Sequence, residues 1–183
     1  MYLTKRNIFS VVLILFLSAA LFSQKNNEDK LALQYLEQKE YDKANVYLEK
    51  LYDKVPEQWF SYYYTGLVGA KDYNRAEKIC KKQLKRSPHN VNIFIYIAKL
   101  YREQGDTKKE NENYEKAIKE VIPAQNYIQQ LAFAFTEERL YDFAIETYKK
   151  GRKATPEYPY YYEIAEIYKR KGDLKAMINE YLD

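Results

Sequence analysis

Small residues recur along this chain at a nearly constant interval, and that interval restricts what the chain can fold into. They lie at Ala32, Gly66, Ala98, Ala132 and Ala165, separated by 34, 32, 34 and 33 residues. Prolines keep a similar spacing, at Pro56, Pro88, Pro123 and Pro156. A fixed period of this length is typical of repeat proteins, in which each unit is one supersecondary structure that stacks on the next.

The residues around each small site follow a helical pattern. An aromatic residue stands three positions later in four of the five units, at Tyr35, Tyr101, Phe135 and Tyr168, with Gly69 in the second. Residues three apart share one face of a helix. A second small site follows at Ala44, Ala76 and Ala144. Since two helices approach closely only where the side chains at their crossing are small, each unit predicts an antiparallel helix hairpin.

Two irregularities in this pattern lead to further expectations. The third and fifth units carry Glu110 and Met177 at the second small site, which predicts looser packing there. The second unit is two residues shorter between Gly66 and Ala76 than the other units are, which predicts a tighter turn between its helices.

The predicted fold is therefore all-α. The expected helices cover residues 27–38, 41–54, 57–69, 73–86, 91–104, 107–121, 125–137, 141–153, 158–171 and 174–182. Prolines that follow Ser87 and Thr155 favour helix ends at these points, because the residue before a proline avoids the helical conformation.

The same features resemble the tetratricopeptide-repeat (TPR) family over residues 27–183. The best-matching units are the first and the fourth, which carry Ala32, Tyr35, Tyr41, Ala44, Leu48, Leu51 and Pro56, and Ala132, Phe135, Tyr141, Ala144, Tyr148, Gly151 and Pro156. The resemblance implies a right-handed α-solenoid of about five antiparallel helix hairpins, the TPR superhelix. Its first helices would line a groove that holds peptides, helices or whole partner proteins. Asp29 and Leu33 stand where chaperone-binding members carry Lys and Asn, so chaperone C-termini are not the expected ligand.

Residues 1–23 differ from the rest of the chain. Lys5 and Arg6 precede a stretch of apolar and small residues over 8–22, and polar residues follow from Gln24. This is the pattern of a secretory signal peptide, cleaved after Ala20 or Ser23; a short uncleaved anchor is the alternative. Either reading predicts an exported TPR domain over residues 24–183, periplasmic or in the cell envelope if the source is bacterial.

The last repeat ends at Asp183, inside its predicted second helix, without a polar capping helix. Terminal repeats need a solvated outer face. We therefore expect the fifth repeat to be incomplete and the chain to be a fragment or a truncated reading frame.

Nothing in the sequence predicts catalysis, a metal or a cofactor. Cys80 falls at a helix packing site, and His89, the single histidine, lies in a turn beside Pro88. No nucleophile–base set, glycine-rich phosphate loop or paired-cysteine motif is present. Beyond residue 23 the chain has 28 basic and 26 acidic residues. A nucleic-acid partner would call for a larger, clustered excess of basic residues.

The resemblance also implies which residues face the groove: those three before, one after and four after each first-helix small site, with their flanking neighbours. Tyrosine is abundant, with 21 residues of 183, and the runs 62–64 and 160–162 cannot turn wholly inward on a helix. Exposed tyrosines suit protein recognition, with carbohydrate stacking as the rival use. The predicted groove residues are Tyr63, Tyr64, Asn92, Tyr96, Lys99, Arg102, Asn126, Gln129, Phe133, Tyr162 and Glu166.

Two functions fit these observations. The first is an exported, non-catalytic scaffold or adaptor that holds a protein or peptide partner in the groove. The alternative is the N-terminal sensory TPR region of a larger envelope receptor. Any membrane contact would run through an uncleaved leader, and the sequence gives no indication of oligomeric state.

Overall fold

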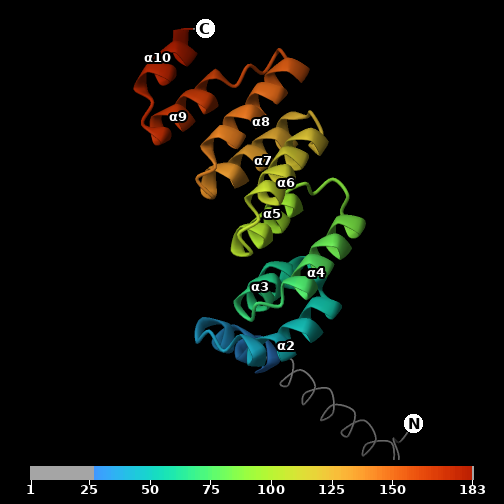
Figure 1. Cartoon of the computed structure of the whole chain (residues 1–183). Coiled ribbons are helices and arrows are strands. Elements are labelled where there is room, and N and C mark those ends of the chain that lie inside the picture. Colours follow the sequence, from blue (N-terminus) through green and yellow to red (C-terminus); the bar gives the residue numbers. More distant parts are fainter. Residues whose placement is uncertain (1–26, 183) are drawn as a thin grey trace, which may run out of the picture. The chain divides into compact units, whose positions relative to one another are not determined.

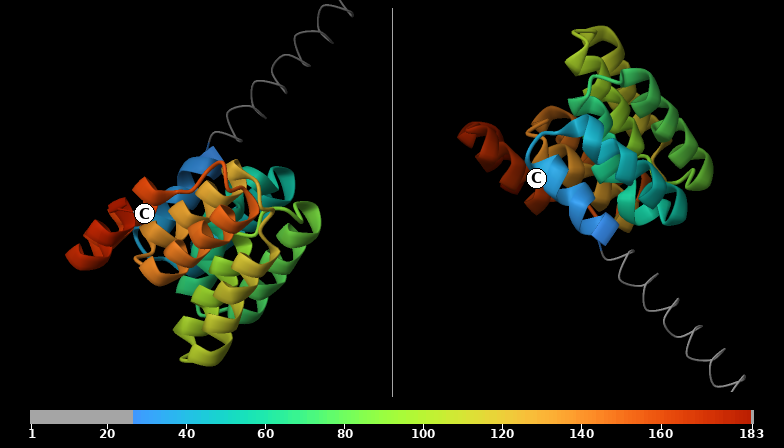
Figure 2. Two further views of the ribbon diagram at one scale, coloured as in Figure 1. Left: turned by 90° about the horizontal axis from the view of Figure 1, so that it is seen from above. Right: turned by 90° about the horizontal axis from the view of Figure 1, so that it is seen from below.

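The computed structural model describes residues 27–182, which are helical apart from turns and short connections (Figure 1). Figure 2 shows helices and no strand over the same residues. The all-α prediction is therefore confirmed for the described part of the chain. The chain divides into two compact units, Met1–Ala76 and Glu77–Asp183. The predicted leader, residues 1–23, lies outside the described residues.

The first unit contains a helical segment over residues 27–37, then α2 (Tyr41–Lys54), α3 (Pro56–Gly69) and the first turn of α4 (Tyr73–Arg86). Only Val55 separates α2 from α3. Pro56 occupies the first helical position, where its missing N–H costs nothing, and it disfavours the helical conformation at Val55, so the chain turns there. Across this corner the rings of Tyr52 and Tyr63 lie 5.5 Å apart in the core.

The second unit continues from α4 through three hairpins (Figure 1). Their helices are α5 (Ile93–Glu103) with α6 (Thr107–Glu120), α7 (Gln125–Glu137) with α8 (Tyr141–Ala154), and α9 (Tyr161–Lys171) with α10 (Leu174–Leu182). The two helices of each hairpin pack together, and α8 also contacts α6 and α9. The predicted starts of α5 and α9 were too early. Residues 87–92 form turns, and Tyr160 has a φ of 57°, which is incompatible with a helix.

One turn geometry recurs between the helices of all five hairpins. A residue with positive φ stands at its centre in each case: Lys39, Lys71, Gly105, Arg139 and Gly172. Its N–H bonds the carbonyl three residues back, and the next N–H bonds the carbonyl five back, as in Asp106 N to Tyr101 O at 2.9 Å. This is the Schellman motif, which ends a helix by pairing its last carbonyls.

These turns overturn the register that the small residues predict for the second hairpin. Ala32, Ala98, Ala132 and Ala165 each lie seven residues before their turn residue, and the equivalent position before Lys71 is Tyr64, not Gly66. The expected tighter turn is therefore wrong. Gly66 is small for another reason, because Asn45 Nδ2 donates to Gly66 O at 3.0 Å and a methyl group would meet the Asn45 amide.

Candidate partner-binding surface

The first helices of the second unit present one side to the core and the other to solvent. Ala98, Ala132 and Ala165 are fully buried on α5, α7 and α9. Residues one after or four after these alanines lie partly or fully outside the core, and Phe133 among them is 63% exposed. We call this side of α5, α7 and α9 the first-helix face. The predicted residues on or beside it are Asn92, Tyr96, Lys99, Arg102, Asn126, Gln129, Phe133, Tyr162 and Glu166.

Tyr63 and Tyr64 do not belong to such a surface. They expose 3% and 5% of their area on α3, so their predicted contact with a partner is wrong. The phenol of Tyr63 accepts a hydrogen bond from Arg75, whose guanidinium also pairs with Glu49 at 3.1 Å. The register error explains the wrong assignment, because the equivalent groove positions on α3 are Ser61, Thr65 and Val68.

The two cations predicted as anchors are already paired within the unit. Lys99 Nζ lies 2.6 Å from Glu138 Oε1, which ties α5 to the end of α7. Arg102 donates to Glu110 Oε1 at 2.7 Å and to the hydroxyl of Tyr114 at 2.7 Å. Each positive charge on this part of the face therefore has an acidic neighbour, and the face is close to neutral.

Glu110 corrects a second expectation, that of loose packing in the third hairpin. Its carboxylate accepts hydrogen bonds from Arg102 and, at 3.2 Å, from Tyr114, whose side chain is buried. Burial raises the pKa of the Tyr114 phenol, so the hydroxyl is kept as a neutral donor. A polar network replaces the small residue at this helix crossing.

A second aromatic group lies on the last hairpin. Tyr162 exposes 66% of its area, and its ring centroid is 6.4 Å from that of Tyr181. Tyr181, which is 48% exposed on α10, donates to Glu166 Oε1 at 3.3 Å. Sequence reasoning missed Tyr181, although it stands four residues after Met177 at a site where the pattern expects a core aromatic.

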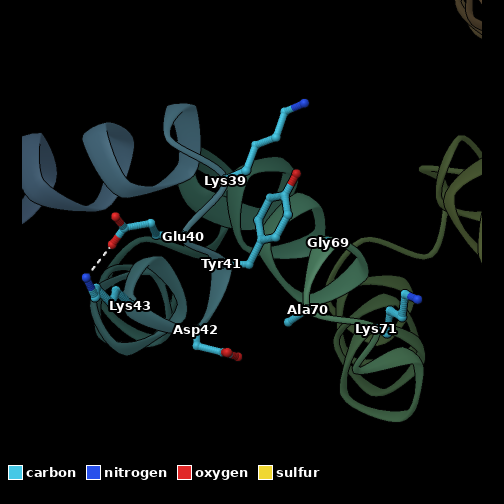
Figure 3. A pocket seen from close by; sticks show the side chains of 8 residues that line it. All are labelled: Lys39, Glu40, Tyr41, Asp42, Lys43, Gly69, Ala70 and Lys71. Carbon is cyan, nitrogen blue, oxygen red and sulfur yellow. Dashed lines mark ion pairs between the residues drawn. The ribbon is translucent and has the colours of Figure 1, made fainter.

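The first unit has a separate hollow of about 460 Å³ between the turns that follow residues 27–37 and α3 (Figure 3). The Tyr41 ring stands between Lys39 and the Gly69–Ala70 backbone, and a methyl group at Gly69 would come within 2.5 Å of that ring. Glu40 pairs with Lys43 at 2.5 Å. With three lysines and two acids around it, the hollow has no strong preference for a ligand of either sign.

The described residues show no metal-binding cluster of His, Cys, Asp or Glu. Cys80 is buried, as predicted, and burial raises the pKa of its thiol, so the reactive thiolate is disfavoured. None of the described helices has the length and hydrophobicity needed to cross a membrane.

Comparison with models of known protein families finds no match, and comparison with curated proteins finds none. Among solved structures, one described as MamA of MSR-1 is 16% identical, with a TM-score of 0.41 over 86% of this chain and 92% of that one. A structure described as MamA protein is 14% identical, with a TM-score of 0.42 over 85% and 87%. A third, MamA of AMB-1, is 18% identical, with a TM-score of 0.41 over 87% and 88%. At such low similarity, what this chain binds has to be argued from its own residues.

Proposed function

We propose that this chain is a TPR-type scaffold that binds a protein partner through the first-helix face of its second unit and has no catalytic role. The observation that carries the proposal is the exposure of two large aromatic side chains, Phe133 at 63% and Tyr162 at 66%. Each stands on a helix whose opposite side is buried against its hairpin partner through Ala132 or Ala165. Large aromatic residues dominate the binding energy of protein interfaces.

The charge distribution refines the kind of partner. A face that grips an acidic peptide would hold unpaired cations, whereas Lys99 and Arg102 are paired with Glu138 and Glu110. Binding would therefore come mainly from burial of apolar area on Phe133, Tyr162 and Tyr181, and it would depend only weakly on salt.

The test is cross-linking of the purified protein to an extract of its source cells, followed by quantitative mass spectrometry. Phe133→Ala and Tyr162→Ala are compared with Tyr62→Ala, which removes an aromatic ring that is 42% exposed in the other unit. We expect the first two changes to remove the same set of partners and Tyr62→Ala to retain it. Full recovery of every partner by the folded Phe133→Ala, Tyr162→Ala double variant would refute the proposal.

We also propose that the chain is exported, on the basis of the residues 1–23 pattern of a basic start followed by an apolar stretch. Cell fractionation and N-terminal sequencing of the mature protein test this directly. A mature chain that begins at Leu21 or Gln24 in the envelope fraction supports the proposal. A cytoplasmic protein that retains Met1 or the residues next to it would contradict it.

A further inference from the structure

A second hollow, of about 370 Å³, lies within the second unit where the connection from α4 to α5 meets the start of α7. Its polar lining consists of Ser87, His89, Asn90, Asn92, Tyr127 and Gln130. No carboxylate, lysine or arginine is among the lining residues. A volume of this size is at the lower end of the range found for small-ligand pockets.

The connection that forms one wall is held by its own backbone. Asn90 N bonds Ser87 O at 3.0 Å, and Val91 N bonds His89 O at 3.0 Å. Val91 is 4% exposed and anchors the wall to the core. The wall is therefore fixed before any ligand binds, which lowers the entropic cost of binding.

The amide side chains that line the hollow are available for hydrogen bonding to a ligand. In the part of the chain that the structure describes, the side chains of Asn92, Gln130 and Asn90 make no hydrogen bond, although other amides do, such as that of Asn113 to Lys109 O at 2.8 Å. Each primary amide offers two N–H donors and one carbonyl acceptor on a single planar group. Three primary amides around one hollow favour a ligand that both donates and accepts hydrogen bonds.

We infer that this hollow binds an uncharged amide group of a partner polypeptide, either a main-chain peptide unit or the side chain of Asn or Gln. The inference rests on the proposed function, because Asn92 leads into α5 and Gln130 lies on α7, two helices of the first-helix face. An Asn or Gln side chain could pair with one lining amide through two hydrogen bonds at once, whereas the N–H and C=O of a main-chain peptide unit point in opposite directions and would each bond a different lining amide. An anion or cation would find no carboxylate, lysine or arginine in the lining to compensate its charge.

The experiment is a ¹H–¹⁵N NMR titration of the protein, in the form isolated after expression in its source cells, with three small probes. They are N-acetylglycine N-methylamide as a peptide unit, acetate as an anion and glucose as a saccharide. We expect saturable shifts of the backbone amides of Val91 and Tyr127 with the amide probe alone. The affinity should be roughly millimolar, since so small a ligand buries little area.

Asn92→Leu combined with Gln130→Leu should abolish these shifts, whereas Asn111→Leu, an exposed amide on α6 away from the hollow, should preserve them. If the double variant loses helical signal, Gln130→Leu alone serves, since Gln130 is exposed. No saturable shift with the amide probe would overturn the inference. So would a response to acetate or glucose equal to or greater than that to the amide. The probes need no partner, so failure here and failure of the cross-linking test are distinguishable.

Discussion

Helices α3 and α7 are both the first helix of a hairpin and both carry aromatic residues where sequence reasoning expects a binding groove, yet they use these residues differently. On α3 the side chains of Tyr63 and Tyr64 are buried at 3% and 5% exposure, whereas Phe133 on α7 is 63% exposed. The difference is one of register. The position occupied by the buried Ala132 on α7 is occupied by Tyr64 on α3, so α3 buries an aromatic ring at the position where α7 buries a methyl group.

The largest effect that tests this comparison is expected for Tyr64→Ala. Removal of a buried aromatic side chain leaves a cavity, and the free energy of unfolding should fall by about 3–5 kcal/mol. Tyr62→Ala, on the same helix but 42% exposed and with its ring 5.5 Å from that of Trp59, is the control and should lower it by only about 1 kcal/mol. Urea titration followed by circular dichroism measures both. Equal losses for the two variants would contradict the alignment of Tyr64 with Ala132.

The converse change on α7 is Ala132→Leu. Ala132 is fully buried at the crossing with α8, so the added carbons should overpack it and destabilise the protein by about 1–3 kcal/mol. Phe133→Ala changes the next residue, which is mostly exposed, and should be close to neutral. The same urea titration compares them. A harmless Ala132→Leu would mean that α7 and α8 do not meet closely at this residue.

The repeat and the hairpins were predictable from sequence because they depend on a period, which survives errors at single positions. The register of α3 was not predictable, because Gly66 falls where the period places a small residue. Gly66 is small there because it packs against Asn45, which donates a hydrogen bond to its carbonyl. Alignment on the turn would have found it, since Lys71-Asp72-Tyr73 has the same lysine and tyrosine as Lys39-Glu40-Tyr41, with an acid between them in both. The pairing of Arg102 with Glu110 was also hidden, because the pattern identifies Glu110 only as a departure from a small residue.

Glu110→Ala tests this directly, because the looser packing predicted from sequence at Glu110 would make a change to alanine neutral or stabilising. The carboxylate accepts from Arg102 at 2.7 Å and from the buried Tyr114 at 3.2 Å. Its removal leaves the phenol without that acceptor, and the free energy of unfolding should fall by about 1–2 kcal/mol. Glu112→Ala, on the exposed side of α6, is the control. Thermal unfolding of both variants gives the comparison, and a Glu110→Ala protein as stable as the control would restore the original expectation.

The smallest expected effect concerns the turns that follow α3 and α7, which have the same backbone geometry. Lys71 and Arg139 adopt positive φ after these helices, whereas Gly105 and Gly172 do so in two other hairpins. A side chain is strained in this conformation, and glycine is not. Arg139→Gly should therefore stabilise the protein by about 0.5–1 kcal/mol, since the Arg139 side chain is exposed and makes no hydrogen bond or ion pair with the rest of the described chain.

The reverse change, Gly105→Ala, should destabilise by a similar amount. No atom lies within 4 Å of the added methyl group, so the loss would come from the backbone alone. Differential scanning calorimetry of both variants resolves shifts of this size, because about 1 kcal/mol moves the melting temperature of a chain this long by roughly 2–4 °C. If both variants melted at lower temperature than the parent, the arginine side chain would be stabilising the turn through its charge at the helix C-terminus, and backbone strain would be the weaker of the two effects.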